Sequence, residues 1–332
     1  MLVTLILQAN DADSYFQFGL IADHTGYIFP PIKEFGIYTL SYIYRYFYYF
    51  LNLDFYSITF FFNCVGFWVL VLFDTVLIKG EKLLDYKKMD LKYYLIFFPS
   101  LSLWHTYLGK EVLTVGLLIF FAYIYINTSR KMSFLFFSLI LILIFFIRPH
   151  FAFIFSLSFI FINVLQIKSI IIKILICLLI FPVYLISAKH LLGQETHFFG
   201  IFQDILKAAE AQRSLWSISS GWVDTSEMNY IFIYLNFLFN PLFNFGGLRN
   251  IILSGENLLI LTVILYYSYM NRKKFLTENY FFLIFFIIGS IMLSLFTAET
   301  GIYWRQKWLL LPYLFIFLVN PINVAKKKNI SN

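Results

Sequence analysis

Charged residues are scarce in this 332-residue chain, where they make up 13% of the sequence, against about 25% in soluble globular proteins. Cysteine is scarcer still: Cys64 and Cys177 stand alone in apolar segments, which argues against a disulfide framework and a zinc site. No Walker loop, Gly-rich dinucleotide fingerprint or HExxH motif occurs, so we expect no nucleotide-driven pump, no cofactor and no metal.

Apolar residues dominate instead, with 61% hydrophobic and 22% aromatic residues spread along the whole chain. This composition predicts an all-α fold, a polytopic membrane helical bundle with about nine to ten transmembrane helices. A bilayer core needs about 20 apolar residues per helix. We place nine spans near residues 55–78, 93–108, 111–127, 133–148, 151–166, 169–188, 251–270, 280–298 and 306–321.

Three regions between or before these spans have a different character. Residues 35–51 are rich in tyrosine with Arg45 in the middle, which favours a helix lying at the membrane interface. The apolar stretch 229–247 contains Asn236, Asn240, Pro241 and Asn244, which favours an interfacial or re-entrant element. The polar stretch 189–228 contains a helical segment followed by a loop, and a loop of this size is typically functional.

These regions suggest four parts: an external N-terminal loop with its interfacial helix at 1–54, a first bundle of six spans at 55–188, an external loop with short helices at 189–250, and the last three spans with a basic tail at 251–332. Residues 1–8 are apolar but too short to cross a bilayer. Either they are the tail of a first span whose chain starts further upstream, or the short start is real.

The distribution of lysine and arginine predicts which ends of the spans are cytoplasmic. Fifteen of the 25 basic residues fall on one side when the spans alternate, which by the positive-inside rule is the cytoplasm. They are Lys79, Lys82, Lys87, Lys88, Lys92, Arg130, Lys131, Lys168, Lys173, Arg272, Lys273, Lys274, Lys326, Lys327 and Lys328. We therefore expect a multi-pass protein of the bacterial inner membrane with a cytoplasmic C-terminus, and the net charge of +7 gives no reason to expect nucleic acid as a partner.

The other ten basic residues lie on the external side, against this rule. They are Lys33, Arg45, Lys110, Arg148, Lys189, Lys207, Arg213, Arg249, Arg305 and Lys307. Some of them are solvated loop charges, and those at helix ends could reach lipid head groups. Charges at the ends of apolar helices are nevertheless costly and tend to be functional. Because the guanidinium fork matches phosphate oxygens, the group predicts a site for a lipid-linked phosphate or pyrophosphate.

The segment FFPSLSLWHTYLGKE contains the first candidates. Trp104 is an interfacial anchor by its residue type, and Gly109 permits a tight turn that presents Lys110 and Glu111 at the start of the next helix. Glu111 is a candidate base that would accept the proton of an acceptor hydroxyl. The alternative is that Lys110 and Glu111 only neutralise one another.

The segment FFIRPHFAF forms a tight external turn between two apolar runs. Arg148 is a candidate phosphate ligand there. His150 could transfer a proton near neutral pH, although a single histidine at an interface is more often structural.

Four further candidates come from the C-terminal third. Arg249 precedes an acidic residue, Glu256, that lies inside a span and is a functional candidate by default; its alternative role is to pair with an external arginine. Glu299 and Arg305 flank a short external turn that contains Gly301.

In the polar external stretch 189–228, Arg213 and Trp216 are candidates for contact with sugar or pyrophosphate.

These segments together resemble bacterial polysaccharide polymerases of the Wzy type. Residues 99–111 are similar to the family's "PS..FW.S..GK[DE]" segment, and residues 148–150 to its "RPH" turn. The stretch from Pro241 to Asn257 is similar to "RP.P…EN", with Asn240 where an arginine is usual. Residues 301–312 are similar to "G…RQR…P".

The resemblance implies a GT-C-like multispanning glycosyltransferase. Such enzymes take undecaprenyl-pyrophosphate-linked oligosaccharide units on the outer face of the plasma membrane and transfer the growing O-antigen or capsule glycan to a new unit. It implies a flippase and a chain-length regulator as partners.

Other functions stay open at this point. Asp13, followed by a Pro-Pro pair and the aromatic segment, resembles the first external loop of glycosyltransferases that use a polyprenyl-monophosphate sugar, in which an acidic residue is the base. A lipid-linked oligosaccharide transporter would place charges along the middle of its spans, whereas here they gather at the ends. A structural subunit of a membrane complex is a third class.

Overall fold

The computed structural model describes residues 39–82, 109–166, 169, 201–218, 221–242, 248–271 and 280–319. Within these ranges the chain is helical apart from its turns and one isolated antiparallel β-bridge between Trp222 and Glu299. The all-α prediction is therefore confirmed for this part of the chain. The helices are α2 (Thr39–Leu51), α3 (Phe55–Lys82), α6 (Lys110–Asn127), α7 (Arg130–Ile147), α8 (Pro149–Gln166), α10 (Ile201–Ser214), η3 (Leu215–Ile218), α11 (Tyr230–Phe239), α12 (Leu248–Asn271), α13 (Tyr280–Phe296) and α14 (Thr300–Val319).

Among the described residues, three helices are long and apolar enough to cross a membrane: Phe55–Leu77 in α3, Lys110–Asn127 in α6 and Asn250–Met270 in α12. Shorter apolar helices cover Met132–Ile147, Pro149–Val164 and Tyr280–Phe296. Together with α14, these helices account for every predicted span except 93–108 and 169–188, which lie outside the described residues. The coarse prediction of a helical membrane bundle is consistent with these elements.

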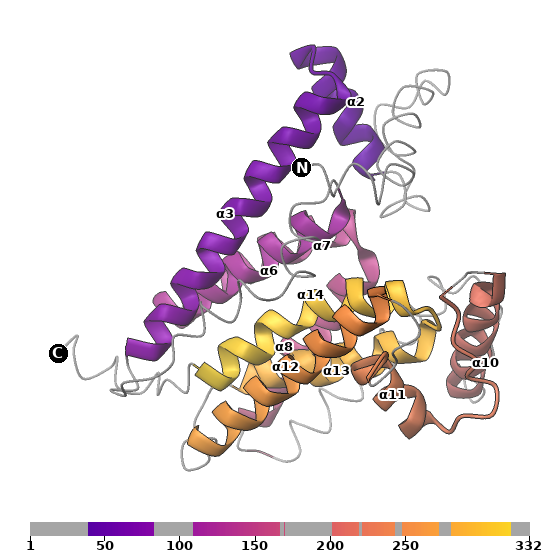
Figure 1. The fold of residues 1–332 in the computed structure, drawn as a ribbon. Coiled ribbons are helices and arrows are strands. Elements are labelled where there is room, and N and C mark those ends of the chain that lie inside the picture. Colours follow the sequence, from indigo (N-terminus) through magenta and orange to yellow (C-terminus); the bar gives the residue numbers. More distant parts are fainter. Residues whose placement is uncertain are drawn as a thin grey trace.

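The long helices form one bundle (Figure 1). α13 packs against α14 and α8, and α3 packs against α6 and α14, so helices from both ends of the chain share one hydrophobic core. The predicted first bundle and last three spans are thus interleaved in space. α13 lies close to α14 at Gly289, where an added Cβ atom would lie 2.6 Å from a methyl carbon of Leu310.

α2 and α3 form a hairpin at one end of the bundle (Figure 1). α2 packs its buried face, including Leu40 and Tyr44, against Phe62 of α3, while its other face exposes aromatic residues such as Phe50. The carboxylate of Asp54 accepts a hydrogen bond of 2.9 Å from the backbone N–H of Ser57 and so caps α3. Hydrogen bonds from Ser57 also hold the pKa of this exposed carboxyl below its ordinary value.

α11 is too short to cross a membrane, since its ten residues extend about 15 Å. It begins at an Asn229 cap, whose side chain accepts a hydrogen bond from the backbone N–H of Phe232. Its other end lies inside the bundle: Asn257 of α12 donates to the carbonyl oxygen of Phe239 at 2.8 Å, and the hydroxyl of Ser254 donates to that of Pro241.

Asn257 and Ser254 are buried and lie about two turns from the start of α12. The chain therefore enters the bundle through α11 and returns to the same end to begin α12. Of the two interpretations of stretch 229–247, interfacial or re-entrant, this path favours the re-entrant one.

Candidate functional site

Four helix ends meet at one end of the bundle and carry the charged side chains predicted from the sequence. α6 begins at Lys110, and α14 begins at Thr300. Arg148 is the single residue between α7 and α8, and Pro149 takes the first position of α8, where its missing N–H costs no hydrogen bond. The carbonyl oxygen of Arg148 accepts hydrogen bonds from Phe151 and Ala152, which fixes this tight turn.

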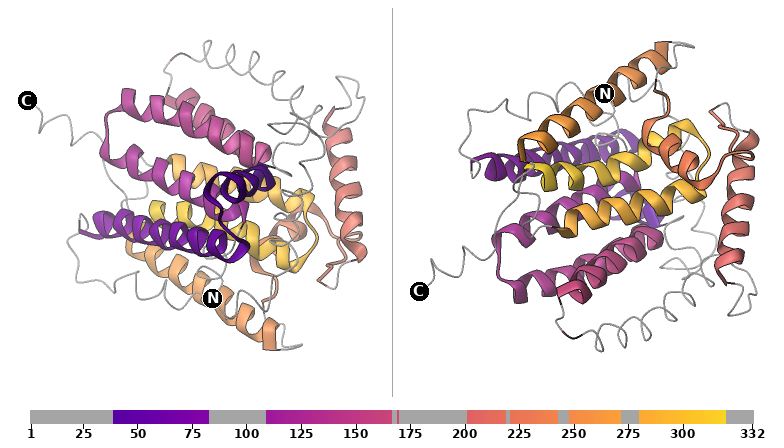
Figure 2. Two further views of the ribbon diagram at one scale, coloured as in Figure 1. Left: turned by 90° about the horizontal axis from the view of Figure 1, so that it is seen from above. Right: turned by 90° about the horizontal axis from the view of Figure 1, so that it is seen from below.

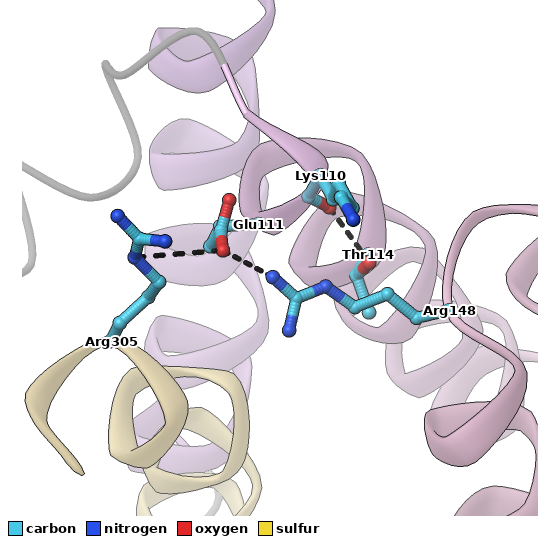
Figure 3. A network of polar contacts seen from close by, with 5 residues as sticks. All are labelled: Lys110, Glu111, Thr114, Arg148 and Arg305. Atoms are coloured by element: carbon cyan, nitrogen blue, oxygen red, sulfur yellow. Dashed lines mark hydrogen bonds and ion pairs between the residues drawn. The ribbon is translucent and has the colours of Figure 1, made fainter. Parts of the chain in front are cut away.

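Glu111 lies between Arg148 of the α7–α8 turn and Arg305 of α14 (Figure 3). Its Oε1 atom forms an ion pair with Nη2 of Arg148 and lies 3.7 Å from Nε of Arg305. Glu111 and Arg148 are both buried, whereas the side chain of Arg305 is 26% exposed. The second carboxylate oxygen points away from both guanidinium groups in Figure 3. We call Lys110, Glu111, Arg148 and Arg305 the charged cluster.

Helix electrostatics stabilise the carboxylate of the charged cluster. Glu111 lies in the first turn of α6, where the partial positive charge of the helix N-terminus stabilises a carboxylate. Arg148 lies between the negative C-terminal end of α7 and the positive N-terminal end of α8, so the two helix dipoles offset one another and Glu111 is its stabilising partner. Lys110 is half-buried beside them, and its carbonyl oxygen accepts a hydrogen bond of 2.7 Å from the hydroxyl of Thr114. With three cations and one carboxylate, the charged cluster has a positive balance that an anionic ligand would neutralise.

His150 lies at the edge of the charged cluster, two residues after Arg148. Its side chain is exposed, and its ring centroid lies 5.1 Å from that of Phe151. The guanidinium carbon of Arg148 lies 5.6 Å from the centre of the same phenyl ring. The ring of Phe151 therefore lies near both the buried arginine and the exposed histidine.

A second polar site surrounds Lys307, which is buried two turns inside α14. Its Nζ atom donates to the carbonyl oxygen of Leu238 at 3.1 Å and to the side-chain oxygen of Asn257 at 3.2 Å. The ammonium group also lies 3.9 Å from the centre of the Trp304 ring, and the buried Glu256 attracts it electrostatically. Lys307 thus caps the inner end of α11, as a cation near a helix C-terminus can.

Arg213 does not contact Glu111. Its buried guanidinium group donates from Nη1 to the carbonyl oxygen of Leu295 at 2.6 Å, in the last turn of α13. Glu299 takes part in the β-bridge to Trp222, and Trp216 is half-buried in η3. These residues therefore lie around the turn between α13 and α14 and outside the charged cluster.

The turn between α13 and α14 is shorter than the sequence suggested. The sequence placed Gly301 and the residues up to Arg305 in a turn, but α14 already begins at Thr300. The backbone N–H of Thr300 is bound by the carbonyl oxygen of Gly221, and that of Tyr303 by Glu299, which starts the helix early. Arg305 consequently lies within a helix, and the helix backbone fixes the direction of its Cα–Cβ bond.

The remaining candidates lie outside what the structure describes. Asp13 and Trp104 fall in ranges that are not described. Arg249 lies in the first turn of α12, and its side chain is likewise not described. Lys307 was seen in the sequence only as an external charge, although a lysine inside an apolar helix next to Trp304 and Trp308 could have signalled a buried site.

No protein-family model matches the chain, and it has no significant match among curated proteins or among solved structures. Function is therefore argued from the site.

Proposed function

We propose that the protein is a glycosyltransferase that polymerises lipid-linked oligosaccharide units, taking the growing glycan from undecaprenyl pyrophosphate on the outer face of the bacterial plasma membrane. The observation that carries the proposal is the ion-pair network in which Arg148 and Arg305 contact one oxygen of Glu111. It supports a pyrophosphate site because two guanidinium groups and a nearby ammonium group meet where apolar helices end.

The spatial arrangement also supports the resemblance seen in the sequence. Lys110 and Glu111, the Arg-Pro-His turn at 148–150 and Arg305 belong to three of the four similar segments, and they meet in or beside the charged cluster. The fourth segment contributes Asn257 to the site of Lys307, a neighbour of Arg305 on α14. Segments that are far apart in the chain thus gather at one end of the bundle.

In the proposed reaction, a hydroxyl group of the acceptor sugar attacks the anomeric carbon of the donor glycan. The bond from that carbon to the pyrophosphate oxygen breaks, and the acceptor loses its proton to a base. Arg148, Arg305 and Lys110 stabilise the charge that develops on the departing pyrophosphate. Glu111, His150 and Asp13 remain the candidate bases.

Glu111 has a second role in this proposal, because it holds both guanidinium groups in place while the site is empty of ligand. Its outward-pointing oxygen is the one available to an acceptor proton (Figure 3). His150 reaches the same region from the exposed side of the turn. Nine to ten spans and a cytoplasmic C-terminus belong to the same proposal, since the charged cluster would then face outward.

Arg305→Ala tests the proposal, with Lys207→Ala as the matched control because Lys207 is an exposed cation on α10. Each variant is expressed in a strain that lacks the native gene, and the glycan is separated on a gel. Arg305→Ala should lose the long-chain glycan and keep the single-repeat form, and Lys207→Ala should give the wild-type ladder. Wild-type chain length in Arg305→Ala would contradict the assignment.

A binding experiment separates the two donor classes. The purified protein in nanodiscs is titrated with undecaprenyl pyrophosphate and, separately, with undecaprenyl monophosphate. We expect the pyrophosphate to bind more tightly, and Arg305→Ala to weaken it by about tenfold, as loss of a charge-assisted contact does. Equal affinity for both lipids, together with loss of activity in Asp13→Ala, would favour the monophosphate donor.

A further inference from the structure

The turn that joins α13 to α14 determines where Arg305 lies. Residues 201–218 and 221–223, which we call the external segment, bind the last residues of α13 and the first residues of α14. Arg305 lies in the second turn of α14, five residues after Thr300. A helix is rigid over this length, so a shift of its first residue moves Arg305 as well.

The N-terminal side of α14 is held by backbone hydrogen bonds. The N–H of Thr300 donates to the carbonyl oxygen of Gly221 at 2.9 Å, and the N–H of Val223 donates to that of Ala298 at 2.9 Å. The hydroxyl of Thr300 adds a bond of 3.0 Å to Gly221. The first N–H groups of a helix have no partner within it, so the external segment supplies one here.

The C-terminal side of α13 is held by Arg213. The last carbonyl groups of a helix also lack internal partners, and the buried guanidinium group binds the carbonyl oxygen of Leu295. Its positive charge matches the negative end of the helix dipole. α10, which carries Arg213, runs across this end of the bundle in both views of Figure 2 and packs on α13.

Gly221 permits the close contact between the two segments. A Cβ atom at this position would lie 3.2 Å from Oε1 of Glu299, which is tighter than ordinary van der Waals contact. The side chain of Glu299 therefore occupies the space that a larger residue at 221 would need. The external segment therefore contacts the α13–α14 turn through its backbone, at Gly221 and Val223, and through the side chain of Arg213.

We propose that Arg213 is a positioning residue that, with the bridge between Trp222 and Glu299, holds the α13–α14 turn and so fixes Arg305 beside Glu111. The external segment thereby controls the affinity of the charged cluster for the lipid pyrophosphate. This inference rests on the proposed function for its ligand, but the positioning of Arg305 can be measured without one.

The first experiment needs no ligand. Hydrogen exchange is followed at the amides of Val223 and Thr300 in the wild type, in Arg213→Gln and in the control Lys207→Gln. In parallel, Arg305→Cys in a background without Cys64 and Cys177 reports the position of side chain 305 through its rate of thiol labelling. Arg213→Gln should speed both exchange and labelling by roughly tenfold, a typical size for coupling between sites, and Lys207→Gln should change neither.

The second experiment uses a disulfide in place of Arg213. Trp222 and Glu299 form an antiparallel bridge pair that has no hydrogen bonds between its two residues. In pairs of this kind the Cα atoms are about 4.5 Å apart, a distance that a disulfide spans. Arg213→Gln should weaken undecaprenyl pyrophosphate binding by roughly tenfold. Adding Trp222→Cys and Glu299→Cys should restore the affinity under oxidising conditions, and dithiothreitol should remove it again.

The outcomes distinguish the two proposals. If the affinity lost in Arg213→Gln is not restored by the formed disulfide, Arg213 contacts the ligand directly and the inference is wrong. Unchanged labelling at position 305 in Arg213→Gln also overturns it. If the wild type does not bind undecaprenyl pyrophosphate while labelling still depends on Arg213, the proposed function fails and the positioning role stands.

Discussion

Arg148 and Glu111 form a buried ion pair that joins the end of α7 to the start of α6 across 37 positions of sequence. Arg305 approaches the same carboxylate oxygen from α14. Three helices are thus tied together by one carboxylate, so substitutions here affect the fold and the proposed ligand site together. The predictions separate these two effects.

The Arg148→Ala variant should lose both stability and activity. Removing one partner of a buried ion pair costs about 3–5 kcal/mol, and Arg305 still offsets part of this loss because it contacts Glu111. The double variant Arg148→Met, Glu111→Gln has no uncompensated charge at the pair and should recover most of the stability while long-chain glycan stays absent. Thermal unfolding in detergent and a glycan gel measure the two effects. Recovery of the glycan ladder in the double variant would mean that Arg148 serves only the fold.

Glu111→Gln should separate binding from turnover. The substitution keeps the shape but removes one negative charge next to three cations, so undecaprenyl pyrophosphate should bind about fivefold more tightly. If Glu111 is the base, kcat should fall by roughly a hundredfold or more. Titration and single-turnover kinetics measure both quantities. If Glu111→Gln instead weakens undecaprenyl pyrophosphate binding, Glu111 acts by holding the arginines. If kcat is normal in Glu111→Gln but falls by roughly a hundredfold in His150→Gln, the base is His150.

Lys307→Met should destabilise the inner end of α11. The carbonyl oxygen of Leu238 loses a donor, and Glu256 loses its opposite charge, so we expect a loss of about 3–5 kcal/mol. The double variant Lys307→Met, Glu256→Gln should recover part of it. The unfolding midpoint in urea or on heating gives the measurement, with the exposed Lys207→Met as control. A double variant no better than the single one would contradict the coupling of Glu256 to Lys307.

Two glycines make a matched pair for the packing of the bundle. At Gly289 an added Cβ atom would lie 2.6 Å from a methyl carbon of Leu310, whereas at Gly255 nothing lies within 4 Å. Gly289→Ala should therefore destabilise by about 1–3 kcal/mol through overpacking. Gly255→Ala should be neutral or stabilise by up to about 1 kcal/mol, because alanine is the better helix former. Equal stability of the two variants would show that α13 and α14 pack less closely than described.

The proposed orientation can be tested with two cysteines in a background that lacks Cys64 and Cys177. Ser226 is exposed at the end with the charged cluster, and Ser129 is exposed in the turn between α6 and α7 at the opposite end. A membrane-impermeant maleimide added to intact cells should label Ser226→Cys and leave Ser129→Cys unlabelled until the cells are opened. The reverse labelling would place the charged cluster in the cytoplasm and exclude an outer-face reaction.

Hydropathy and charge were sufficient to predict most of the described helices and the meeting of these charged residues at one end of the bundle. The spans near 111–127 and 133–148 coincide with α6 and α7. A long apolar segment in lipid forms a helix because a helix pairs all of its backbone N–H and C=O groups internally. The alternation of basic residues also placed Lys110, Arg148 and Arg305 at one end, where Glu111 links the two arginines. The lipid ligand and the reaction itself stay predictions.

The role of individual side chains was less accessible from the sequence. Arg213 and Arg305 look alike as external arginines, yet Arg213 binds a helix carbonyl and Arg305 approaches a carboxylate. The difference depends on which helix ends meet, and hydropathy does not report those pairings. Lys307 was likewise not recognised as buried, because its partners Leu238 and Asn257 lie 50 or more positions away in the chain.

The path of α11 has a consequence for the order in which the protein assembles. The carbonyl groups at its inner end receive their donors from α12 and α14, both of which are synthesised after it. In the proposed membrane placement these groups would have no water to bind, so α11 would reach its final position only after α12 and α14 are present. The segment would then stay at the membrane surface during synthesis, and its insertion would follow that of α14.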